Sequence, residues 1–118
     1  MTKMYIAGPM SGLPNFNFDA FNYWAAYWRQ QGWTVFNPAQ KDEEAGLDPE
    51  AVKTGDDQLA IKGGWNFRES YQWDLNRILE ADGVFFLKGW EKSTGARGEH
   101  AVAVAIQARY PEFEIIYE

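Results

Sequence analysis

The chain has 118 residues, of which 46% are hydrophobic and 17% aromatic, and its formal net charge at pH 7 is −6. This length and composition predict a single domain over residues 1–118 with one hydrophobic core. The negative charge argues against binding a nucleic acid polymer, which depends on clustered lysine and arginine. The absence of cysteine excludes disulfides and thiolate metal sites. With no signal peptide and no apolar stretch of transmembrane length, we expect a cytoplasmic protein without a membrane partner.

The first half of the chain predicts a strand, a helix and a second strand. Residues 4–7 are a short apolar strand that is closed by Gly8 and Pro9. Apolar side chains spaced by three to four residues predict a helix over 18–31, and residues 33–36 predict the next strand. We expect this unit to open a parallel sheet through a right-handed crossover.

Residues 40–64, the acidic segment, carry three lysines and seven acidic residues, a net charge of −4 that is most of the charge of the chain. The glycines and the weak apolar periodicity of this segment predict a solvated excursion with one short helix over 49–53. The segment is interpreted either as a surface loop or as a mobile lid over a functional site, because long loops in compact domains are often functional.

The second half of the chain continues the alternation of helix and strand. A helix is predicted over 67–80, a buried strand over 83–87, a further helix from Arg97 and a last strand over 113–117. This order predicts an α/β fold of the Rossmann-like or flavodoxin-like kind. We expect an open, mostly parallel sheet of four to five strands with helices on both faces.

The turns after the first and third strands, residues 8–12 and 88–98, are expected to meet at the carboxyl ends of the strands, where such sheets bind ligands. The second turn contains Ser93-Thr94-Gly95-Ala96-Arg97-Gly98-Glu99. A small turn with glycines before a helix exposes N–H groups that suit a phosphate or carboxylate. Glu99 lies about one turn into the helix, where the dipole favours its ionised form. This arrangement indicates a nucleophile aimed at a sugar whose phosphate lies in the turn.

Three motifs in this order resemble the nucleoside 2-deoxyribosyltransferase superfamily. They are Tyr5-Ile6-Ala7-Gly8-Pro9-Met10, the helix motif Trp73-Asp74-Leu75 leading to Ala81-Asp82-Gly83-Val84, and the 93–99 turn followed by His100-Ala101-Val102-Ala103. The resemblance covers residues 4–38 and 68–109 and leaves out the acidic segment. It implies that Glu99 attacks the anomeric carbon of a nucleoside and forms a glycosyl-enzyme intermediate, which water or a second base resolves, as in retaining glycosidases.

The same resemblance implies roles for residues of the first strand and the second helix. Tyr5 matches a tyrosine that orients the nucleophile, and Asp74 matches an aspartate that contacts the base or assists its departure. Gly8 lets the backbone approach the ligand. Ser11, in the loop after the first strand, is a candidate second phosphate ligand.

The 93–99 turn distinguishes two branches of the superfamily. Transferases that use free nucleosides tend to carry an acidic residue six positions before the nucleophile. Hydrolases of deoxynucleoside 5′-monophosphates resemble this chain in having a serine there, followed by a glycine, as in Ser93 and Gly95. Arg97 departs from the pattern, which has a second glycine at that place, and its guanidinium adds a charged donor for phosphate.

We therefore expect hydrolysis of the N-glycosidic bond of a (deoxy)nucleoside 5′-monophosphate, without a metal or organic cofactor. The lone histidine, His100, has no ligand cluster near it. Three alternatives stay open: a non-catalytic nucleotide-binding or sequestering module, like many small phage-encoded proteins; a free-nucleoside transferase; and a purely structural or interaction protein. A homodimer or higher homo-oligomer is expected. The tryptophans are interpreted mostly as core or interface residues, and those at 65, 73 and 90, near predicted loops, as candidate stacking partners for a base.

Overall fold

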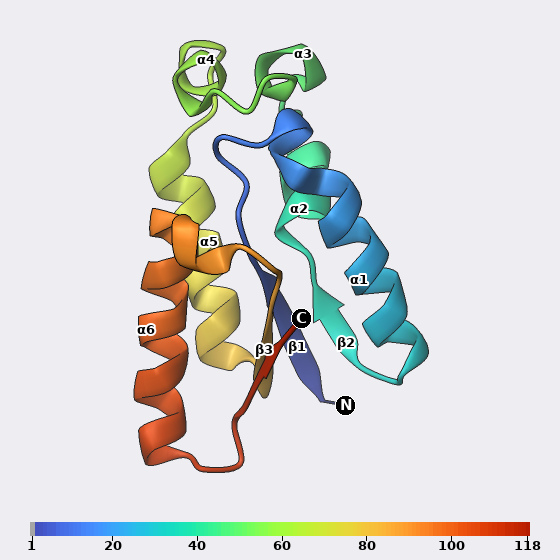
Figure 1. The fold of residues 1–118 in the computed structure, drawn as a ribbon, viewed down its shortest axis with the longest axis vertical. Helices are drawn as coiled ribbons and strands as arrows, with labels where there is room; N and C mark the ends of the chain where they lie inside the picture. Colours follow the sequence, from blue (N-terminus) through green and yellow to red (C-terminus); the bar gives the residue numbers. More distant parts are fainter. Residues whose placement is uncertain (1) are drawn as a thin grey trace.

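Four parallel strands form one open sheet in the computed structural model, which describes residues 2–118 (Figure 1). The strand order is β2-β1-β3-β4, with β1 (Lys3–Ala7), β2 (Thr34–Phe36), β3 (Gly83–Phe86) and β4 (Glu114–Tyr117). Each neighbouring pair is parallel. The predicted α/β fold is thus confirmed, with four strands.

Helices cover both faces of the sheet. Alternate residues of β1 point to opposite sides, and both sets are apolar or aromatic, so each face packs against helices. Met4 and Ile6 pack in one core with residues of α1 (Phe18–Gln30) and α2 (Pro38–Glu44). Tyr5 and Ala7 pack in the other core with residues of α5 (Phe67–Glu80) and α6 (Thr94–Arg109). The side chain of Tyr5 therefore lies on the face of the sheet that α5 and α6 cover.

The short helix predicted over 49–53 is confirmed as α3 (Pro49–Val52), but the acidic segment holds more helix than predicted. It contains most of α2, together with α3 and α4 (Asp57–Lys62). Asn37, Asp48 and Asp56 precede these three helices, and each side chain accepts a hydrogen bond from a backbone N–H of the first turn. Such caps satisfy N–H groups that have no partner within the helix.

Helices α3 and α4 lie beyond the carboxyl ends of the strands, at one end of the molecule (Figure 1). Val52 of α3 and Ala60 of α4 are buried against Phe16, which forms a small third core. Phe16 belongs to the short helix η1 (Pro14–Asn17), whose residues 15–17 have positive φ angles. The acidic segment is therefore packed onto the domain through an apolar contact.

The loops after β1 and β3 meet, as predicted. Leu87 N donates a 2.8 Å hydrogen bond to the carbonyl of Ala7. A Cβ atom added to Gly8 would lie 2.6 Å from Cβ of Leu87, so only glycine fits where the loop after β1 passes the end of β3. A second short helix, η2 (Trp90–Lys92), continues the loop after β3 toward α6. Within residues 2–118, we find no helix with the length and apolar character needed to span a membrane.

Candidate active site

Glu99 lies on α6 and faces the sheet, with only 5% of the residue exposed. The hydroxyl of Tyr5 donates a 2.6 Å hydrogen bond to Oε2 of Glu99, across 94 positions of sequence. Burial raises the pKa of Glu99 well above its usual range, and the charge of Asp74 raises it further. The hydrogen bond from Tyr5 and the charge of Lys41 lower it. Burial thus opposes the ionisation that the helix dipole was expected to favour.

Asp74 lies on α5, and its carboxyl group is the second acid of the site. Burial raises its pKa to about 6, against the lowering effect of Lys41, whose Nζ lies 3.1 Å from Asp74 Oδ1. The Tyr5 hydroxyl also lowers this pKa. Tyr5 thus acts on both carboxyl groups, and the structure brings together the three residues for which the resemblance implies a catalytic role.

Lys41 and two polar neighbours complete this group, and sequence reasoning missed all three. Lys41 Nζ lies 3.0 Å from Asp42 Oδ1 and donates a 2.6 Å hydrogen bond to Ser70 Oγ. Ser70 Oγ in turn donates to Asp42 Oδ1 at 3.1 Å. Two signals were available in the sequence. Ser70 stands one helical turn before Asp74, and Lys41 and Asp42 follow the carboxyl end of a predicted strand.

Tyr71 fixes the start of α6 against α5. Its hydroxyl donates a 2.6 Å hydrogen bond to the carbonyl of Gly95. A Cβ atom added to Gly98 would collide with that hydroxyl, so the second glycine of the helix start makes room for Tyr71. Burial raises the pKa of Tyr71 to about 12, with further contributions from Glu99 and Asp74. The hydroxyl of Tyr71 therefore lies close enough to both acids to feel their charge.

The start of α6 differs from the predicted turn, because the helix begins at Thr94 and not at Arg97. Ser93 is its N-cap, and Ser93 Oγ accepts a 3.1 Å hydrogen bond from Ala96 N. The first two helical N–H groups, those of Thr94 and Gly95, have no acceptor within a helix. The guanidinium of Arg97 is exposed one turn from the cap. Ser93 thus has a structural role besides the ligand role expected of it.

The remaining predicted ligand residues lie in the loop after β1. Gly8 is buried, and its close approach is to Leu87 rather than to open space. Ser11 is exposed, whereas Glu99 is buried. The ligand roles of Gly8 and Ser11 stay predictions.

The three tryptophans considered as stacking partners for a base, at positions 65, 73 and 90, have different surroundings. Trp90 stacks on His100, with ring centroids 4.2 Å apart, and His100 Nε2 lies 2.7 Å from the hydroxyl of Tyr117. Trp73 packs under Lys41 Nζ, 4.9 Å from the ring centroid. Trp65 packs against Phe16. In the described part of the chain, no group of three or more histidine or acidic side chains is placed to hold a metal ion.

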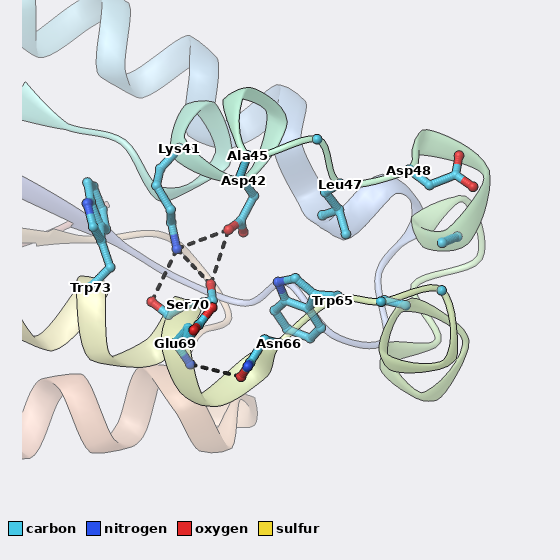
Figure 2. A pocket seen from close by; sticks show the side chains of 15 residues that line it. Lys41, Asp42, Ala45, Leu47, Asp48, Trp65, Asn66, Glu69, Ser70 and Trp73 are labelled. Carbon is cyan, nitrogen blue, oxygen red and sulfur yellow. Dashed lines mark hydrogen bonds and ion pairs between the residues drawn. The ribbon is translucent and has the colours of Figure 1, made fainter.

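A cavity of about 450 Å³ lies next to the acidic group, between α2, the α3–α4 segment and the start of α5 (Figure 2). Lys41, Asp42, Ser70 and Trp73 are among its lining residues, and Glu99 is not. Lys41 Nζ contacts Asp42 in the cavity wall and Asp74 in the acidic group. The lysine therefore connects the cavity to the two carboxyl groups.

Together, the fold and this site define a class: an α/β protein with a parallel sheet that carries two carboxyl groups and a tyrosine, all buried or nearly so, between β1, α5 and α6. The chain belongs to the family described as domain of unknown function (DUF4406), whose sequence pattern matches residues 2–110. No curated protein and no solved structure matches the chain.

Proposed function

We propose that the protein hydrolyses the N-glycosidic bond of a (deoxy)nucleoside 5′-monophosphate, with Glu99 as the nucleophile. The observation that carries this proposal is the 2.6 Å hydrogen bond from the Tyr5 hydroxyl to Glu99 Oε2, beside a second carboxyl group with a pKa of about 6. An oriented carboxylate with a neighbouring acid is the arrangement that retaining glycosidases use. The resemblance to the nucleoside 2-deoxyribosyltransferase superfamily supports the same chemistry.

In the proposed first step, a Glu99 carboxylate oxygen bonds to C1′ of the sugar and the bond from C1′ to the base nitrogen breaks. The electron pair stays on the base, and the protonated carboxyl group of Asp74 supplies the proton that the base takes up. In the second step water attacks C1′, the ester to Glu99 breaks, and Asp74 accepts the proton from water. The products are the free base and the sugar phosphate.

The surroundings of the two acids suit these roles. A carboxyl group with a pKa near 6 exchanges its proton readily at neutral pH, as a general acid and base must. Glu99 has to react as the carboxylate, and the hydrogen bond from Tyr5 and the charge of Lys41 favour this form against its burial. Burial of the pair strengthens every electrostatic contribution to the transition state.

The phosphate is assigned to the start of α6. The N–H groups of Thr94 and Gly95 have no acceptor within the helix, and the Arg97 side chain is exposed beside them. The Ser93 hydroxyl can still donate while its oxygen accepts from Ala96. These groups favour a 5′-monophosphate over a free nucleoside, which is the substrate expected of a transferase.

The test is a panel of deoxynucleosides, ribonucleosides and their 5′-monophosphates, incubated with the protein and analysed by chromatography for free base. Release of base from monophosphates by the wild-type protein, and its loss in Glu99→Gln, is the expected result. Base exchange between two nucleosides without net release would instead identify a transferase.

A non-catalytic nucleotide-binding module is the second candidate. It is favoured by the burial of Glu99, which is 5% exposed and lines none of the cavities described for residues 2–118. Tight nucleotide binding without base release would identify this function. The homo-oligomer and the cytoplasmic location stay predictions, and light scattering of the purified protein tests the first of them.

A further inference from the structure

The cavity beside Lys41 is built largely by the acidic segment, the part of the chain that lies outside the resemblance. Its volume of about 450 Å³ is within the range of small-molecule sites. Small residues from this part of the chain leave the space open: Ala45, Gly46, Ala51, Ala60, Gly63 and Gly64. α3 and α4 are held in place by their buried contacts with Phe16, so the cavity wall is part of the packed domain.

Two polar groups in the cavity wall are available to a ligand. Trp65 Nε1 is buried, and within residues 2–118 it has no hydrogen-bond partner. Figure 2 shows the indole nitrogen of Trp65 turned toward the side of the cavity where Asp42 lies. The contacts of the Asp42 carboxylate with Lys41 and Ser70 are both made by Oδ1, which leaves Oδ2 to accept from a ligand. An unpaired buried N–H is costly unless something accepts from it.

The charges around the cavity exclude an anion as its preferred ligand. Asp42, Asp48 and Glu69 are carboxylates in its lining. Lys41 is the one cation among the lining residues, and its ammonium group is already held by Asp42, Asp74 and Ser70. The net negative lining would repel a phosphate, whereas it would not repel a neutral or protonated ligand with N–H donors.

We propose that this cavity binds the base of the nucleotide and prefers bases with an exocyclic amine, such as adenine and cytosine. This inference rests on the proposed function, in which the base is the leaving group. The amine donates to Asp42, and a ring nitrogen accepts from the Trp65 N–H. The Trp65 ring supplies a flat aromatic wall. The acidic segment therefore determines which base is accepted.

The experiment is calorimetric titration of adenine, cytosine, hypoxanthine and uracil into the full chain, at concentrations up to millimolar. Adenine and cytosine are expected to bind at least about tenfold more tightly than the other two bases. Trp65→Phe keeps an aromatic ring but removes the N–H donor, and it should weaken adenine binding about fivefold or more. Ala45→Leu, at an exposed position in the cavity lining, should weaken binding by filling the space.

Trp28→Phe is the matched control, because Trp28 Nε1 is also buried without a partner in residues 2–118 but packs on Phe85, away from the cavity. It should leave base binding unchanged, and thermal melts show whether each variant is folded. Equal binding in wild type, Trp65→Phe and Ala45→Leu would overturn the inference. So would a lack of binding by all four bases, or a preference for hypoxanthine and uracil.

Hydrolysis of monophosphates by the wild-type protein is measured separately, so the two proposals fail in different ways. Base binding that depends on Trp65, without any hydrolysis, would leave the cavity assignment standing and remove the proposed reaction. Hydrolysis together with base binding that is unchanged in Trp65→Phe and Ala45→Leu would support the reaction and contradict the cavity assignment.

Discussion

The hydroxyl of Tyr5 on β1 lies 2.6 Å from Oε2 of Glu99 on α6, and both residues are almost completely buried. Burial raises the pKa of Tyr5 well above 10.0, and the charges of Glu99 and Asp74 raise it further. The phenol therefore stays protonated at neutral pH and acts as a donor. This hydrogen bond fixes the carboxyl group of Glu99 relative to the sheet, as the proposed role of Glu99 as a nucleophile requires.

Replacement of Tyr5 by phenylalanine is predicted to slow the proposed base release by about 10²-fold, because Glu99, the proposed nucleophile, loses the donor that positions it. The hydrogen bond also lowers the pKa of Glu99. Its loss should move the ascending limb of the pH–rate profile to higher pH. Tyr71→Phe is the matched control, since that hydroxyl donates to the carbonyl of Gly95 and not to a carboxylate. Equal changes in the two variants would contradict the role given to Tyr5.

Asp74 is predicted to make the protein less stable as the pH rises from about 4 to about 6. Its pKa is raised from 3.8 to about 6 in the folded state, so the native protein holds a proton that the unfolded chain has released. The free energy of unfolding therefore falls across this window, by up to about 3 kcal/mol from this residue. Denaturant titrations at several pH values should show a smaller fall in Asp74→Asn. An unchanged pH dependence would mean that Asp74 titrates normally.

Lys41 is predicted to be essential for the stability of the acidic group. Lys41→Met removes the cation between Asp42 and Asp74 and should cost about 3 kcal/mol at neutral pH, because partly buried carboxylates are left without a counter-charge. It should also raise the pKa of Asp74 above its value in the wild type. Lys41→Arg keeps the charge and should recover part of the loss. Carboxyl resonances in NMR titrations measure the pKa, and a Lys41→Met variant as stable as wild type would refute this prediction.

Gly98 and Tyr71 are predicted to be coupled. Gly98→Ala alone forces its methyl group against the Tyr71 hydroxyl and should destabilise the protein by about 1–3 kcal/mol. In a Tyr71→Phe background the hydroxyl is gone, and alanine should then stabilise α6 by up to about 1 kcal/mol through its helix propensity. A double-mutant cycle of unfolding free energies measures this change of sign. Additive effects would contradict the contact.

The fold could be predicted from the sequence because each of its main elements has a clear local signal. The apolar runs at β1 and β3 and the helical periodicity of α1 and α5 placed these elements within one or two residues. In the acidic segment only α3 was predicted, since the short helices have little apolar periodicity. The signals missed are the caps of α2 and α4, Asn37 with the proline that follows it and Asp56.

The acidic site was predictable only in part. Glu99, Asp74 and Tyr5 were found through motifs, but Lys41, Asp42 and Ser70 have no motif of their own. The contacts that join α2 to α5 span 28 to 33 positions of sequence, as in the pairing of Asp42 with Ser70 and of Lys41 with Asp74. The ionisation of Glu99 was misjudged because burial cannot be read from a position near a helix start. The helix-dipole contribution is small beside the desolvation of a carboxylate.

Intact-protein mass spectrometry tests most directly whether Glu99 is the nucleophile. The wild-type protein is mixed with a deoxynucleoside 5′-monophosphate, and the reaction is quenched in acid. We expect a mass increase equal to the sugar phosphate, mapped to Glu99 by peptide analysis and missing from Glu99→Gln. Release of free base with an adduct at another residue, or with the same rate in Glu99→Gln, would contradict the claim that Glu99 is the nucleophile.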